Sequence, residues 1–78
     1  MAAKELLEYI ARNLVDDPEA VDVTEVGSEG GVLLQLRVAP DDMGKVIGRG
    51  GRTARAIRAV VRAAATTSGV PASVEIVE

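Results

Sequence analysis

The sequence has no histidine and no cysteine, and Tyr9 is its only aromatic residue. Without cysteine there is no disulfide and no thiolate nucleophile, and without histidine there is neither a Ser-His-Asp triad nor a Cys/His zinc site. A single aromatic ring also excludes recognition that stacks several bases on aromatic side chains. This composition favours binding over catalysis, and we expect no cofactor and no metal.

The length and composition predict one globular domain. The chain has 78 residues, of which 47% are hydrophobic and 27% are charged, the balance of a folded soluble protein. A domain of this size buries only about 60% of the surface of its unfolded chain, so burial by oligomerisation would add stability. No apolar run approaches the roughly 20 residues that span a bilayer, and Glu5 and Glu8 interrupt any signal-peptide pattern. We therefore expect a cytoplasmic protein that has no membrane partner.

The charges are strongly segregated along the chain. The formal net charge is -3, which by itself does not suggest nucleic-acid binding. Residues 1–42 have a net charge of -7, however, whereas residues 43–68 carry six basic residues and no acidic one. The six are Lys45, Arg49, Arg52, Arg55, Arg58 and Arg62. Such a segment is typical of a site that binds a polyanion.

Hydrophobic periodicity predicts an α+β fold with the order α-β-β-α-α-β and the helices on one face of a three-stranded sheet. The expected elements are helix 3–15, strand 20–26, strand 32–38, helix 43–47, helix 52–67 and strand 72–77. A glycine-rich turn at 27–31 is expected to close a hairpin, and Asp41 or Asp42 to cap the short helix.

Apolar residues at helical or alternating spacing define the expected core. In the first helix these are Leu6, Leu7, Ile10 and Leu14; in the second and third strands they are Val32, Leu34, Leu36, Val38, Val74 and Ile76; in the long helix they are Ala54, Ile57, Val60, Val61 and Ala64.

A loop of three glycines, 48–51 (the glycine loop), separates the two central helices. Glycine costs roughly 1 kcal/mol relative to alanine in a helix, so a purely structural joint would need only one. Glycines without Cβ atoms let a phosphodiester backbone approach the main chain and the positive end of the next helix. The spacing does not match the dinucleotide-binding fingerprint, because Thr53 replaces its third glycine, nor the P-loop, because Val46 follows Gly44-Lys45.

The long helix carries its arginines on one side. At about 100° per residue, its four arginines fall within a stripe roughly 120° wide, which we call the arginine face. They are Arg52, Arg55, Arg58 and Arg62. An arginine stripe alone is commonly a solvated surface. A stripe beside a glycine loop, without the acidic residues that ordinarily pair with arginine at i, i+4, favours phosphate binding.

The stretch 46–57, VIGRGGRTARAI, resembles the KH-domain signature I-G-x-x-G-x-x-I-x-x-I, with G-x-x-G at Gly48–Gly51. The element order is similar to the type II, prokaryotic KH topology. Over its whole length the chain resembles the KhpA family of small bacterial single-KH-domain proteins. The chain departs from the general pattern at Ala54, where isoleucine is usual, and at Gly50, where a basic residue is commoner.

The resemblance implies single-stranded RNA as the ligand and assigns a binding site. The implied RNA-binding residues are Lys45, Val46, Ile47, Gly48, Arg49, Gly50, Gly51, Arg52 and Arg55. Of these, Val46 and Ile47, together with Leu36, are implied to form the floor of the groove. In KH domains the G-x-x-G loop packs on the backbone of about four nucleotides. The family is also associated with a KhpB partner, RNA chaperone-like activity, post-transcriptional control and cell-envelope growth and cell shape.

Two other classes of function stay open. Ala56, Ala59 and Ala63 form a small-residue stripe bordered by Val60, which would suit a homodimer or heterodimer module with little RNA affinity of its own. An enzyme is the weakest alternative, because the paired carboxylates at 16–17 and 41–42 lie next to prolines at element ends, where capping explains them.

Overall fold

The computed structural model describes residues 2–78, except for the side chain of Ser28. Its order of helices and strands is the predicted α-β-β-α-α-β. The helices are α1 (Ala3–Leu14), α2 (Met43–Ile47) and α3 (Arg52–Ser68), and the strands are β1 (Asp22–Ser28), β2 (Gly31–Arg37) and β3 (Ala72–Ile76). Three short 3₁₀ turns, at Pro18–Ala20, Pro40–Asp42 and Arg49–Gly51, complete the chain. The helices described lack the combination of length and apolarity needed to cross a membrane.

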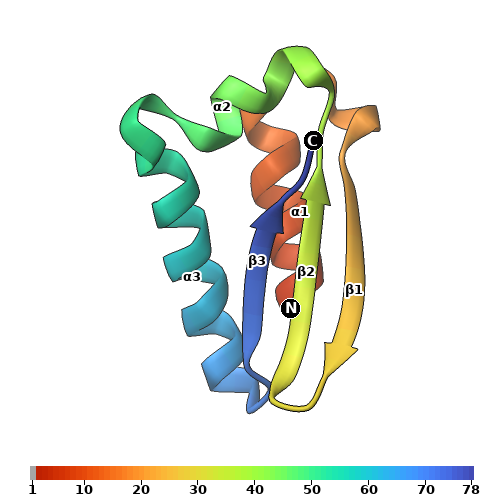
Figure 1. Ribbon diagram of the computed structural model, residues 1–78, viewed down its shortest axis with the longest axis vertical. Helices are drawn as coiled ribbons and strands as arrows, with labels where there is room; N and C mark the ends of the chain where they lie inside the picture. The colour runs from red at the N-terminus through yellow and green to blue at the C-terminus, as the bar shows by residue number, and fades with distance from the viewer. Residues whose placement is uncertain (1) are drawn as a thin grey trace.

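The sheet has the order β1-β2-β3, with β1 antiparallel and β3 parallel to the central strand β2. Figure 1 shows α1 crossing one face of the sheet and α3 lying beside β3, with α2 at the end of the sheet where β2 finishes. The parallel pairing of β2 and β3 requires a crossover, and α2, the glycine loop and α3 supply it. The glycine loop therefore lies at one end of the molecule and the hairpin at the other.

The core lies between the sheet and the helices and follows the predicted alternation. Leu34, Leu36 and Val38 are buried and Val32 is half-buried, as expected for the inner face of β2. The fully buried large side chains are Leu7, Leu34, Leu36, Val46 and Val61. Aliphatic side chains thus provide the packing that aromatic residues supply in other small domains.

Two apolar residues expected in the core are exposed. Val60 is 50% exposed, whereas Ala65, which was not predicted, is buried. The buried line of α3 runs through Ile57, Val61 and Ala65 at intervals of four, so Val60 is turned about 100° away from it. Leu14 is 38% exposed because α1 ends at this residue.

The hairpin is tighter than predicted. Strands β1 and β2 pair as far as Ser28 and Gly31, which leaves only Glu29 and Gly30 between them instead of a five-residue turn. At its other end, β1 begins at Asp22 because the preceding residues form a 3₁₀ turn. The pairing of β2 with β3 begins at Val32 and Ala72, so Gly30 and Gly31 at the end of the hairpin lie close to the start of β3.

The predicted capping of α2 by an aspartate is wrong. Asp42 occupies the N-cap position, but its side chain makes no cap hydrogen bond. Its carboxylate instead accepts a hydrogen bond from the backbone N–H of Asp17, 25 residues earlier in the chain, at 3.1 Å. Asp42 is 2% exposed and therefore belongs to a buried corner between the end of α1 and the start of α2.

Candidate nucleic-acid interface

The glycine loop has a backbone that only glycine adopts without strain. Gly48, Gly50 and Gly51 have φ values of 75°, 65° and 76°, in the region that L side chains rarely occupy. The N–H of Gly51 donates to the carbonyl oxygen of Gly48 at 3.1 Å and closes the turn. The three glycines therefore produce a sharp reversal between α2 and α3.

The glycines differ in what surrounds them. A Cβ atom at Gly48 would lie 2.7 Å from the Cβ and 2.9 Å from the backbone nitrogen of Thr53, so packing as well as conformation requires glycine there. A Cβ atom at Gly50 would have no neighbour within 4 Å. The tip of the loop thus presents bare backbone to solvent, which supports the interpretation that part of the loop serves close approach of a ligand.

Arginines flank the loop on its α3 side. Arg55 Nη1 donates to the carbonyl oxygen of Gly50 at 3.0 Å, which fixes its guanidinium against the loop. Arg49 at the tip and Arg52 in the first turn of α3 are both exposed. The N–H of Arg52 donates to the carbonyl oxygen of Arg49, and the positive end of the α3 dipole lies on the same surface as the guanidinium groups.

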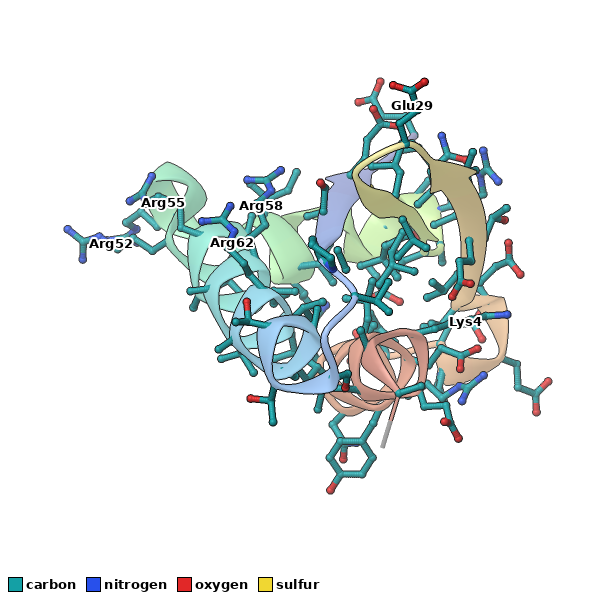
Figure 2. The ribbon with its side chains drawn as sticks, turned by 90° about the horizontal axis from the view of Figure 1, so that it is seen from below. Lys4, Glu29, Arg52, Arg55, Arg58 and Arg62 are labelled. Carbon is teal, nitrogen blue, oxygen red and sulfur yellow. The ribbon has the colours of Figure 1, made fainter. Side chains whose placement is uncertain are left out.

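The arginine face continues along α3 toward the hairpin. Arg58 Nε donates to the carbonyl oxygen of Val74 at 3.3 Å and so links α3 to β3. Figure 2 shows the four arginine side chains gathered on one flank of α3, away from Lys4 of α1. Within residues 2–78, no carboxylate lies within 4.0 Å of Arg49 or of any arginine of this face. The flank is therefore a surface of uncompensated positive charge.

Lys45 differs from the arginines because its charge is compensated. Its Nζ lies 2.9 Å from a carboxylate oxygen of Asp16 and 3.5 Å from one of Asp42. The hydrogen bond and charge of Asp16, reinforced by Asp42, raise the pKa of Lys45 above its usual value. Neither pair was predicted: Asp16 is 29 residues away in the sequence, and Asp42, although at i, i+3 spacing, was counted with the acidic segment 1–42. A lysine tied to two carboxylates offers less charge to a phosphate than an unpaired arginine.

The pKa of Asp42 is shifted in the opposite direction. Burial alone would raise it, but hydrogen bonds from the backbone N–H groups of Asp17 and Asp16, together with the charge of Lys45, lower the pKa below 3.8. Asp42 is therefore a buried carboxylate that stays ionised because polar groups surround it.

The expected apolar groove floor is largely absent from the surface. Val46 and Leu36 are fully buried, so their side chains belong to the core and offer no exposed surface. Ile47, the last residue of α2, is 38% exposed beside the glycine loop. Of the three apolar residues assigned to the floor, Ile47 alone is accessible.

Residues 4–76 match the model of one protein family, described as the KH domain of KhpA and KhpB. The match covers nearly all of the chain. The chain belongs to the KhpA/KhpB family of KH domains. The α-β-β-α-α-β order and the glycine loop at Gly48–Gly51 agree with this assignment and with the predicted α+β fold.

Relatives in several bacteria align with almost the full length of the chain. Proteins named RNA-binding protein KhpA are 54% identical in Clostridium acetobutylicum and 55% identical in Clostridium perfringens, each alignment covering 95% of this chain and 99% of the relative. The protein of the same name in Treponema pallidum is 51% identical, over 96% of this chain and 94% of the relative. These relatives thus share one name and match nearly the whole length of this chain.

Among solved structures, a crystal structure of an Aquifex aeolicus Era variant is similar in fold. Its TM-score is 0.62 at 17% sequence identity, and the superposition covers 95% of this chain but 29% of the Era chain. At this identity the similarity concerns the fold alone, which thus also occurs as one part of a larger protein.

Proposed function

We propose that this KH domain binds single-stranded RNA, with the glycine loop on the sugar-phosphate backbone and the neighbouring arginines on phosphates. The observation that carries the proposal is the uncompensated arginine surface beside the exposed backbone of the loop. The relatives are named RNA-binding proteins, which supports RNA as the ligand. Without aromatic platforms, affinity depends mainly on charge, and sequence preference is expected to be low.

The proposed contact residues follow the predicted set with one change, the removal of the buried Val46. They are Lys45, Ile47, Gly48, Arg49, Gly50, Gly51, Arg52 and Arg55. Lys45 is retained at the border of the set, since its side chain is exposed although it is ion-paired. The protein is proposed to act by binding alone, because a guanidinium surface without histidine or cysteine offers no evident nucleophile or general base near neutral pH.

A double substitution at the loop tip tests the proposal. Arg49→Glu with Gly50→Asp places two carboxylates where a phosphate would lie, and a side chain at position 50 meets no neighbouring atom. Fluorescence anisotropy with labelled oligouridylates is expected to show at least tenfold weaker binding. The matched control is Arg12→Glu with Gly27→Asp, the same residue changes on α1 and β1, where a side chain at position 27 also has open space.

The control variant is expected to bind RNA within about twofold of wild type, because long-range charge effects are screened beyond roughly 10 Å at 0.1 M salt. Equal loss of affinity in both variants would mean that net charge, not the loop, determines binding. Wild-type affinity in the loop variant would contradict the proposed site.

We further propose that the protein works in the cytoplasm as an RNA chaperone or post-transcriptional regulator, with a KhpB partner and a role in cell-envelope growth and cell shape. The support is the family itself, whose model covers both KhpA and KhpB domains. Deleting the gene and measuring cell dimensions, with the loop-tip variant as the complementing allele, tests whether the role depends on RNA. Co-purification with tagged KhpB tests the partnership.

Dimerisation through α3 is a second candidate function, favoured by the exposure of Val60. Val60 is 50% exposed, next to the exposed alanines Ala56, Ala59 and Ala63. A dimer would bury this surface and pair two RNA sites, which raises avidity without new RNA contacts. Analytical ultracentrifugation of wild type against Val60→Asp tests it, and a monomeric mass for both proteins would reject a dimer through this helix.

A further inference from the structure

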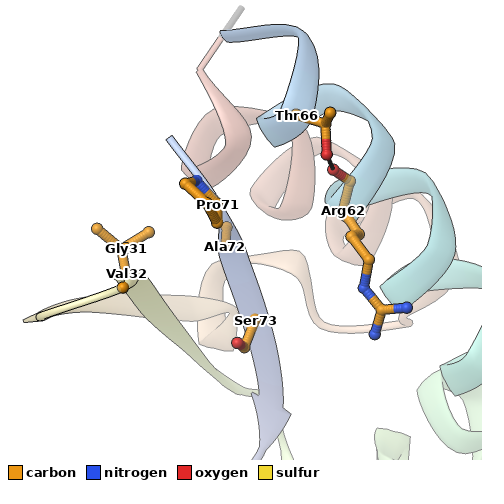
Figure 3. Close-up of a pocket in the computed structure, with 8 residues that line it drawn as sticks. Gly31, Val32, Arg62, Thr66, Pro71, Ala72 and Ser73 are labelled. Atoms are coloured by element: carbon orange, nitrogen blue, oxygen red, sulfur yellow. Dashed lines mark hydrogen bonds between the residues drawn. The ribbon is translucent and has the colours of Figure 1, made fainter. Parts of the chain in front are cut away.

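An open pocket lies at the far end of the arginine face from the glycine loop. Its volume is about 330 Å³. It is lined by Gly30, Gly31, Val32, Arg62, Thr66, Pro71, Ala72 and Ser73. The C-terminal half of α3 forms one wall, and the hairpin and the start of β3 form the other, as Figure 3 shows. This volume is at the lower end of the range for ligand pockets, the size of a single nucleotide rather than of a larger cofactor.

The positively charged arginine face connects the pocket with the proposed RNA site. Arg62 is the last member of the arginine face and lies ten residues beyond Arg52, or about 15 Å along the helix. Arg58 lies between them and contacts β3 at Val74. Figure 3 shows the Arg62 side chain directed back along α3, between the helix and β3. Positive charge therefore follows the space between α3 and β3 from the glycine loop to the pocket.

The groups that line the pocket suit a nucleotide. No carboxylate of the described chain lies within 4.0 Å of Arg62, and its side chain makes no hydrogen bond to residues 2–78, so its guanidinium is free to bind a phosphate. Pro71 and the half-buried Val32 contribute apolar atoms to the lining. Gly30 and Gly31 of the hairpin line the pocket without adding side chains to it.

The free edge of β3 adds backbone hydrogen-bonding groups. The N–H of Val32 donates to the carbonyl oxygen of Pro71 at 2.9 Å, so Pro71 faces β2. Because successive residues of a strand direct their backbone groups to opposite sides, the N–H and C=O of Ala72 face away from β2, toward the pocket. A base in the pocket would find both a donor and an acceptor there.

We propose that this pocket binds one further nucleotide of the same RNA strand, beyond the roughly four that a G-x-x-G loop holds. The proposal rests on the proposed function, since the glycine loop anchors the strand. It assigns to Arg62 the phosphate of the added nucleotide. RNA of four nucleotides then occupies the loop site alone, whereas RNA of eight nucleotides reaches both sites.

Uridine oligonucleotides of two lengths, U4 and U8, test the proposal by NMR titration of the labelled full-length protein. Both oligonucleotides are expected to shift the amide signals of the glycine loop, and U8 alone those of Gly31, Ala72 and Ser73. Arg62→Gln is expected to weaken U8 binding about five- to tenfold, as expected for the loss of one charged contact, and to leave U4 binding unchanged. It should also reduce the salt dependence of U8 binding by about 0.7 in log–log slope.

A second variant keeps Arg62 and changes the pocket wall. Thr66 lies one turn after Arg62, and its Oγ1 donates to the Arg62 carbonyl oxygen at 2.9 Å. Thr66→Glu adds a carboxylate beside the guanidinium and is expected to weaken U8 binding as much as Arg62→Gln, whereas Thr66→Gln is expected to have no effect. Because both positions are exposed, the variants should remain folded, and the NMR spectra verify this.

The proposal is overturned if U8 leaves the pocket signals unshifted, or if Arg62→Gln weakens U4 and U8 equally. The loop-tip variant separates this failure from failure of the proposed function. It should abolish the binding of both oligonucleotides if the loop anchors RNA, whatever the pocket does. Normal U4 binding by that variant would contradict the loop site itself.

Discussion

The carboxylate of Asp42 accepts a hydrogen bond from the backbone N–H of Asp17 at 3.1 Å and joins the turn after α1 to the start of α2. The contact crosses 25 residues of sequence and is almost fully buried. On the same side, Lys45 bridges Asp42 and Asp16. Since α2 leads directly into the glycine loop, we expect this corner to position the proposed RNA site.

Removing the Asp42 carboxylate is expected to destabilise the domain. In Asp42→Ala the backbone N–H of Asp17 loses its acceptor, and a buried donor without a partner is costly. Urea unfolding should show a lower midpoint for Asp42→Ala than for Asp42→Asn, because asparagine retains an acceptor oxygen. Asp41→Ala, one residue earlier and exposed, is the matched control and should unfold near the wild-type midpoint. Equal midpoints for Asp42→Ala and Asp41→Ala would contradict the role of the corner.

The same carboxylate makes stability depend on pH. The pKa of Asp42 is lowered from 3.8, so the unfolded chain takes up its proton more readily than the folded one. The stabilisation from this group is therefore complete above about pH 5 and is lost as the pH falls through 3.8 toward the folded-state pKa. The difference in urea midpoint between wild type and Asp42→Asn should shrink between about pH 6 and pH 3. A difference that is constant over this range would show that the charge of Asp42 does not contribute.

The corner also shows which features a sequence reveals. Helix 43–47 was predicted with its observed bounds because its signals are local, a proline and aspartates before it and glycine after it. The pairing of Lys45 with Asp16 spans 29 residues and depends on how α1 packs beside α2, which no periodicity encodes. The charge count therefore described the basic segment 43–68 correctly, but it did not show that Lys45 is paired with acidic residues from another part of the chain.

Predicting which side chains are buried was also limited by packing that the sequence pattern does not encode. Alternation in β2 identified Leu34 and Leu36 as core residues, because a strand has only two faces. In α3 the width of the buried face depends on what covers the helix, so Val60 was assigned to the core although it is half exposed. Val46 was placed at an RNA-binding surface by resemblance to a motif, whereas its side chain is fully buried. The motif identifies the glycine loop, whereas packing decides which of the motif's side chains are exposed.

The ion pairs of Lys45 lead to a difference between two positively charged residues of the proposed site. Arg52 has no carboxylate within 4.0 Å among residues 2–78, whereas Lys45 has two. If the protein neutralises about four phosphates of the RNA, log affinity should fall with log salt at a slope near -3. Arg52→Gln should reduce the magnitude of that slope by about 0.7, the value for one phosphate on a single strand. Lys45→Gln should change it by less than half as much, and a larger change for Lys45→Gln would mean that RNA displaces Asp16.

Alanine substitutions at Gly48 and Gly50 separate the two uses of the glycine loop. Gly48 combines φ 75° with ψ 170°, a region almost confined to glycine, and its Cβ would collide with Thr53. Gly50, at φ 65° and ψ 17°, has a left-handed conformation with open space around it. Gly48→Ala is expected to lower the free energy of unfolding by about 2 kcal/mol or more and Gly50→Ala by about 1 kcal/mol, measured by urea unfolding.

RNA binding by the same two variants completes the comparison. Below the unfolding midpoint, Gly50→Ala should weaken RNA binding more than its small loss of stability explains, because the methyl group stands where the RNA backbone would approach the loop. Gly48→Ala combined with Thr53→Ala removes the Thr53 hydroxyl, the atom that lies nearest to a Cβ at position 48, and should recover some of the lost stability. Full RNA affinity in Gly50→Ala would show that the bare backbone at the tip is not a contact surface.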